Sequence, residues 1–271
     1  MIFSHKYIFP MTFKDLTNED ISFETKNGKR YRYEIEHFKE TSELYISLFS
    51  NSKRINRDKS KVDYVQLIAI KIFQDTRAAL LLALKGLFPQ ASSLLRGAIE
   101  SYYLVYDFKI NPNFEDFWFN GSKTQRKKLF KLSAVRQRVK EACVTETGSL
   151  NGLYHLLSQI SVHVNMESHL WYLELRDKKL FYHWAGFDSV NKSDALINSC
   201  LQSLAQGLFI FTYEGFYALD KNWSADFTVW KKQHLIFVKK LARTFSIEGY
   251  EYLDLKEDKI EIVNPQIKIV K

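Results

Sequence analysis

The sequence predicts a mainly α protein, an antiparallel helical bundle with peripheral β-hairpins. Apolar residues recur at three- and four-residue spacing through long stretches of the chain, which is the periodicity of amphipathic helices. The 271 residues include only 10 glycines and 4 prolines, which favours long regular elements with few tight turns. Hydrophobic residues make up 46%, as in globular proteins and unlike disordered ones. We expect residues 1–271 to form a single domain.

The ends of the chain and one internal segment predict β-hairpins. Residues 20–35 contain Asn27-Gly28, the pair that two-residue type I′ turns prefer, between flanks rich in β-forming residues. A second hairpin is expected over residues 169–186. Residues 249–270 alternate apolar and polar side chains, which predicts two short C-terminal strands.

The rest of the chain predicts helices. The connection between the helices expected at 62–87 and 90–109 is short, so these two should be antiparallel neighbours. Residues 123–142 are expected to form one long helix that turns an apolar stripe toward the core and basic residues toward solvent. The expected helices are 38–50, 62–87, 90–109, 113–121 (a short helix or a turn), 123–142, 150–164, 193–219 and 226–244.

A polar stripe interrupts the most apolar of these helices. Arg96, Glu100, Tyr103 and Asp107 are spaced by four, three and four residues, which places them on one helical face. The other faces are apolar, so the helix should be central in the bundle. A lone buried charge is costly, and the stripe must therefore meet partners from other helices.

We expect those partners to come from two neighbouring helices. Arg77 lies in an equally apolar stretch and His163 ends the helix at 150–164, so Arg77, Arg96, Glu100 and His163 are predicted to form one polar cluster inside the bundle. As a functional site, arginine would hold phosphate or carboxylate, glutamate would orient the imidazole and histidine would exchange a proton. As a structural element, the same residues would be a buried ion network that fixes helix register. The sequence leaves both interpretations open.

The segment 123–140 carries eight lysines and arginines and no acidic residue, as many charges as the net charge of +8 for the whole chain. Such a surface suits phosphate backbones, which it binds through salt-sensitive contacts that ignore sequence. A solvated amphipathic helix is the alternative. The residues that we expect to bind phosphate are Arg77, Lys127, Lys128, Lys131 and Arg138.

Two segments on either side of the basic helix carry a resemblance to known proteins. LFPQASSLLRGAIESYYLVYDF contains R-x-x-x-E, and LYHLLSQISVHVN is a Leu-Ser segment that ends in histidine. Over residues 62–165 this order resembles an uncharacterised bacterial family of helical proteins, which is similar in layout to the HEPN superfamily. That superfamily often acts in RNA cleavage, phage defence or toxin–antitoxin systems. The resemblance implies an RNA-associated protein and, if it is an enzyme, a metal-independent ribonuclease-type phosphodiesterase with Arg96, Glu100 and His163 as catalytic residues.

The sequence departs from the HEPN pattern where cleavage would occur. Active members carry R-x4–6-H on a late helix, whereas residues 157–159 before His163 are Leu-Ser-Gln. Arg96 can replace that arginine only from another helix. Three other pairs have the R-x4–6-H spacing, but they lie in or beside predicted hairpins and are interpreted as coincidence. These pairs are Arg32 with His37, Arg30 with His37, and Arg176 with His183.

Three hypotheses remain: a HEPN-like nucleic-acid-associated protein of RNA targeting or phage defence, a non-catalytic interaction module that uses the basic helix, and a binder of a small anionic ligand.

The charge-free run at 195–213 contains several amides and hydroxyls, which favours a buried helix over a membrane span. Two distant cysteines favour a reduced, cytoplasmic protein. We expect a homodimer with RNA or another polyanion as partner, and no membrane, metal or cofactor.

Overall fold

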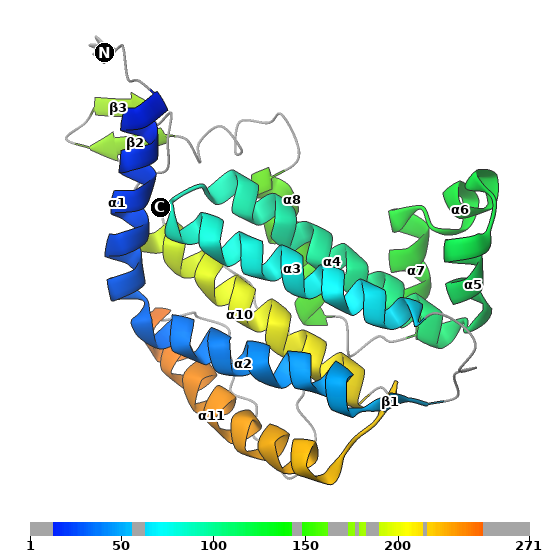
Figure 1. Ribbon diagram of the computed structural model, residues 1–271. Coiled ribbons are helices and arrows are strands. Elements are labelled where there is room, and N and C mark those ends of the chain that lie inside the picture. Colours follow the sequence, from blue (N-terminus) through cyan, green and yellow to red (C-terminus); the bar gives the residue numbers. More distant parts are fainter. Residues whose placement is uncertain are drawn as a thin grey trace.

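The computed structural model describes residues 13–55, 63–142, 148–161, 173–176, 179–182, 190–213 and 216–245 (Figure 1). Helices dominate these residues, which confirms the mainly α class. The elements are α1 Phe13–Arg30, α2 Arg32–Asn51, β1 Lys53–Arg54, α3 Tyr64–Leu84, α4 Phe88–Ile110, α5 Asn113–Asn120, α6 Lys123–Leu129, α7 Leu132–Ala142, α8 Gly148–Ser161, β2 Leu173–Arg176, β3 Lys179–Tyr182, α10 Val190–Tyr213, β4 Tyr217–Ala218 and α11 Lys221–Phe245.

Helix α4 is the centre of the bundle, as its apolar composition predicts. It packs along α3, and α8, α7 and α10 cover its other sides. Helix α10 also contacts α3 and α2, and α11 closes the bundle against α2 (Figure 1). The core is therefore shared by helices that are far apart in the sequence, which makes the described helices one packed unit.

Local sequence signals mark both ends of α3 and the start of α4. Asp63 caps the start of α3 by accepting a hydrogen bond from the Gln66 amide at 3.0 Å. Gly86 ends it with a φ of 75°, a conformation that glycine adopts without steric cost. Pro89 stands in the first turn of α4, where its missing N–H is not needed. The helices predicted at 62–87 and 90–109 are confirmed.

The hairpin predicted at 20–35 is wrong. These residues belong to α1 and to the start of α2, which meet at Tyr31. Asn27 is fully buried, and its Nδ2 donates a hydrogen bond to the Leu84 carbonyl at 2.9 Å. That carbonyl lies at the end of α3, where backbone acceptors lack partners within the helix. A contact between distant segments thus outweighs the local turn preference of Asn27-Gly28.

The single helix predicted at 123–142 is also wrong, because the chain breaks after α6 and restarts at α7. A capping box formed by Ser122 and Gln125 begins α6. At the break, the ring of Phe130 packs edge-on against Phe108 and Trp118. This aromatic anchor holds the chain toward α4 and α5 where a continuous helix would run past them.

The described strands form two small antiparallel pairs. Strands β2 and β3 pair with Arg176 opposite Lys179, which confirms the hairpin predicted at 169–186. Strands β1 and β4 pair with Arg54 opposite Tyr217, which the sequence did not predict because residues 51–61 are almost all polar or basic. The strands predicted at 249–270 lie outside the described residues.

Helix α10 is the described segment most like a membrane span. Its stretch Lys192–Tyr213 is long and apolar enough to cross a bilayer, but 67% of its most apolar window is buried inside the bundle. That burial is typical of the core helix of a soluble protein, which agrees with the sequence-based expectation.

Candidate functional site

The polar stripe of α4 meets α8 through Arg96. The Arg96 Nε donates to Glu100 Oε1 at 2.9 Å, and its Nη2 donates to the Tyr154 hydroxyl at 3.1 Å. Only 15% of the Arg96 side chain is exposed, against 34% for Glu100. The predicted pairing of Arg96 with Glu100 is therefore confirmed, and α8 supplies a partner for the stripe as expected.

A second arginine, Arg136 of α7, joins the same place. Its guanidinium carbon lies 4.1 Å from the centre of the Tyr154 ring and 5.6 Å from that of Tyr103, within cation–π range of both. Its Nη2 donates to Asn151 Oδ1 at 2.5 Å and lies 3.2 Å from His155 Nε2. Because arginine can only donate, His155 accepts through Nε2 where it contacts Arg136.

From the sequence alone, Arg136 is included only among the basic residues of segment 123–140 that are expected at the surface. The pattern that locates it is its position next to Val135 and three residues before Val139, which are the buried positions of α7. We call the whole group the Arg96–Arg136 cluster. It consists of Arg96, Glu100, Tyr103, Arg136, Asn151, Tyr154 and His155.

The cluster has more hydrogen-bond donors than its own residues satisfy. Arg96 Nη1, Arg136 Nε and the Tyr103 hydroxyl are buried and have no hydrogen-bond partner of normal geometry within the described part of the chain. Burial raises the pKa of Tyr103, whereas the charge of Arg136 and a weak contact of its guanidinium with the hydroxyl oppose that rise, so the phenol stays neutral. Among the described residues, these two guanidinium charges thus have one carboxylate partner, that of Glu100, and the arrangement is suited to accept an anion.

The other residues predicted for an internal cluster are placed differently. Arg77 is exposed on α3, because Thr76, Ala79 and Leu80 occupy the side of that helix that faces the core. The prediction that Arg77 lies inside the bundle is therefore wrong. His163 lies outside the described residues, and its role stays a prediction.

Asp107, the last residue of the stripe, binds Arg138 instead. Arg138 Nε and Nη2 contact its two carboxylate oxygens at 2.8 and 2.5 Å, and Nη2 also donates to the Leu129 carbonyl. Asp107 is fully buried, and the hydrogen bond to it raises the pKa of Arg138. The prediction of Arg138 as an exposed phosphate ligand is wrong, since an internal carboxylate already occupies its guanidinium.

The remaining predicted phosphate ligands lie on the surface as expected. Lys127 and Lys128 of α6 and Lys131 just after it are exposed, and α6 contains no acidic residue. Lys123 and Arg126 of the same helix are exposed too. We call these five side chains, Lys123, Arg126, Lys127, Lys128 and Lys131, the α6 basic surface.

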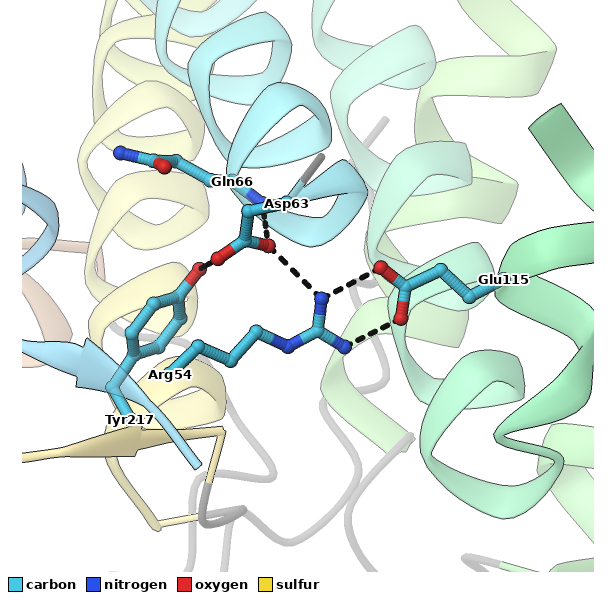
Figure 2. A network of polar contacts seen from close by, with 5 residues as sticks. All are labelled: Arg54, Asp63, Gln66, Glu115 and Tyr217. Carbon is cyan, nitrogen blue, oxygen red and sulfur yellow. Dashed lines mark hydrogen bonds and ion pairs between the residues drawn. The ribbon is translucent and has the colours of Figure 1, made fainter. Parts of the chain in front are cut away.

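A second, partly buried ion network ties the α5 end of the molecule to the bundle (Figure 2). Arg54 of β1 contacts both carboxylate oxygens of Glu115 at 2.6 and 2.5 Å and Asp63 at 2.9 Å. Tyr217 of β4 donates to Asp63 at 3.4 Å, as Figure 2 shows. Two carboxylates surround one guanidinium here, so this network joins β1, β4, α3 and α5 and does not attract anions.

The R-x4-H and R-x6-H pairs around His37 are helical, contrary to the sequence-based interpretation. Arg32 and His37 lie on α2, and Arg30 ends α1. Arg32 and His37 nevertheless lie in different environments. Arg32 is exposed, whereas His37 is buried and hydrogen-bonded to His234 at 3.0 Å. Of the third pair, Arg176 belongs to β2 and His183 lies outside the described residues.

No protein-family model, curated protein or solved structure matches this chain. The resemblance to HEPN proteins therefore stays a prediction. Among the described residues, no three histidine, cysteine, aspartate or glutamate side chains gather as metal ligands would.

Proposed function

We propose that this protein binds RNA through the phosphates of its backbone, with the α6 basic surface as the contact. The observation that carries this proposal is the exposure of five cationic side chains on and next to a helix that has no acidic residue. Cations arranged in this way release the counterions of a nucleic acid and bind it without regard to sequence. The likeness of residues 62–165 to HEPN-type proteins supports RNA as the polyanion.

The α6 basic surface is suited to binding and not to cleavage. Lysine and arginine side chains hold phosphates as fixed charges, whereas phosphodiester cleavage needs groups that gain and lose a proton near neutral pH. The surface contains no histidine or carboxylate that could do so. Within this proposal the protein is an RNA-associated module, and the predicted catalytic role of Arg96, Glu100 and His163 is a separate hypothesis.

Fluorescence anisotropy with a labelled single-stranded RNA tests the proposal. Affinity should fall steeply between 50 and 200 mM salt, concentrations at which phosphate contacts of this kind lose roughly tenfold or more. The triple variant Lys127→Gln/Lys128→Gln/Lys131→Gln should bind at least about tenfold more weakly, and its salt slope should drop by roughly one for each lysine removed.

The matched control removes the same charge from the other side of the bundle. Lys39 of α2 and Lys221 and Lys232 of α11 are exposed, and their triple change to glutamine lowers the net charge equally. It should leave RNA affinity within about twofold. Equal losses of affinity in the two triple variants would show that binding depends only on overall charge, which would refute the α6 contact. Absence of RNA binding at 50 mM salt would refute the proposal as a whole.

A further inference from the structure

We propose that the Arg96–Arg136 cluster is a binding site for one phosphate-class oxyanion, distinct from the α6 basic surface and independent of RNA binding. The site lies where α4, α7 and α8 meet. Its two guanidinium carbons lie 5.2 and 4.1 Å from the centre of the Tyr154 ring. Two like charges drawn to one ring repel each other, and Glu100 offsets only one of them.

The buried donors without partners indicate which kind of ligand fits the cluster. Seven buried side-chain polar atoms lack a partner within the described part of the chain, and three of them belong to this cluster. Arg96 Nη1 and Arg136 Nε can only donate, and the Tyr103 hydroxyl can donate as well. A buried unpaired donor is costly, so the cluster is complete only with an acceptor. A ligand that brings several acceptor oxygens and negative charge satisfies both needs, whereas a cation satisfies neither.

The donors are held in place before any ligand arrives. Glu100 fixes the Nε edge of Arg96, and Asn151 with His155 fixes the Nη2 of Arg136. Fixed donors lose little conformational entropy on binding, which is the condition for recognising a small ion. One edge of the cluster reaches the surface, because His155 is exposed and Glu100 is about one-third exposed, whereas the three donors without partners are buried beside it. Planar guanidinium groups match the oxygens of phosphate, and two of them favour phosphate over a carboxylate.

Titration calorimetry and thermal unfolding of the full chain test the proposal. The ligands are inorganic phosphate, AMP and acetate, and the effect of each is compared with that of chloride at the same ionic strength. We expect saturable binding of one phosphate per chain, a rise in Tm beyond that in chloride, and at least about tenfold weaker binding of acetate. AMP that binds at least as tightly as inorganic phosphate identifies a phosphate monoester as the ligand class, and weaker AMP identifies the free ion. Binding of phosphate no tighter than chloride or acetate would overturn the proposal.

Variants locate the site. Arg136→Gln should weaken phosphate binding at least about tenfold, whereas Lys140→Gln, which removes the same charge from an exposed position of the same helix, should leave it unchanged. Tyr103→Phe removes only a hydroxyl that lacks a hydrogen bond of normal geometry, so the variant should stay folded, and it should weaken phosphate binding several-fold. Unaltered phosphate affinity in both Arg136→Gln and Tyr103→Phe would refute the site.

This test is separable from that of the proposed function. The triple variant Lys127→Gln/Lys128→Gln/Lys131→Gln changes only the α6 basic surface, and it should keep full phosphate binding. Loss of phosphate binding in that variant would place the anion at the lysines and overturn the assignment to the Arg96–Arg136 cluster.

Discussion

The imidazole rings of His37 and His234 lie 3.0 Å apart, Nε2 to Nδ1, in the buried contact between α2 and α11. Trp230 stacks beside both rings. Burial lowers the pKa of each histidine, to about 3 for His234, where the neighbouring His37 adds to the effect. Glu40, 3.6 Å from His37 Nδ1, opposes the shift of His37 but is itself exposed. Both rings are therefore neutral in the fold, and one donates the shared hydrogen bond to the other.

This pair predicts that the protein loses stability as the pH falls. The unfolded chain takes up a proton at each histidine near pH 6.5, whereas the folded chain does so only at lower pH, so protons favour unfolding. The contribution is fully present above pH 6.5 and decreases as the pH falls toward the folded pKa. At pH 5 the lowered pKa of His234 alone corresponds to a loss of about 2 kcal/mol in the free energy of unfolding. Urea unfolding between pH 8 and 5 measures it.

The control replaces both rings by apolar rings of similar shape. His37→Phe/His234→Phe keeps the aromatic packing and removes both proton-binding groups, which is tolerated better than removing one partner of a buried hydrogen bond. Its stability should depend less on pH over the same range. A double variant that loses as much stability as the wild type on acidification would assign the pH dependence to other groups.

Arg138 is predicted to be essential for folding stability because Asp107 has no access to water. Arg138→Met leaves that buried carboxylate without its cation and should cost about 3 kcal/mol or more. The double variant Asp107→Leu/Arg138→Met removes both charges and should recover much of the loss. Urea unfolding of the two variants measures this difference, with Lys140→Met of the same helix as the control for lost charge. Equal stability of the single and double variants would show that the pair is not coupled.

Gly28→Ala distinguishes the observed helix from the hairpin that the sequence predicted. In a type I′ turn, Gly28 would need a positive φ, and alanine there would destabilise the fold. In α1, a Cβ at Gly28 meets no atom within 4 Å, so alanine should raise the free energy of unfolding by about 0.5–1 kcal/mol. Thermal unfolding measures the sign, and a clear loss of stability would favour the turn.

The sequence predicted what depends on periodicity and missed what depends on distant contacts. The stripe of Arg96 and Glu100 and the antiparallel pairing of α3 with α4 follow from spacing along a helix, and both are confirmed. The helix at Asn27 depends on a carbonyl 57 residues away, which no local pattern reveals. Arg136 and Arg138 look alike in the sequence, yet one joins the Arg96–Arg136 cluster and the other binds Asp107. The difference depends on partners from other helices, mainly α8 for Arg136 and α4 for Arg138, and the spacing of residues within α7 does not identify them.

Gly207 of α10 sets how closely that helix approaches α2 and α4. A Cβ on Gly207 would lie 2.5 Å from the Tyr102 hydroxyl and 2.8 Å from Tyr45 Cε2. Neither ring can move aside easily, because both are fully buried and their hydroxyls donate to the Ser203 and Ala69 carbonyls. Gly207→Ala should therefore destabilise the protein by about 1–3 kcal/mol despite the better helix propensity of alanine.

Gly152→Ala on α8 is the matched control for Gly207→Ala, because a Cβ on Gly152 meets no atom within 4 Å. The same substitution there should be neutral or stabilise the protein by about 0.5–1 kcal/mol, since only helix propensity changes. Thermal unfolding of the two variants compares a crowded helix crossing with an open helix face. A stabilising Gly207→Ala would mean that α10 does not approach α2 and α4 this closely, and the packing of the core around Tyr102 would have to be revised.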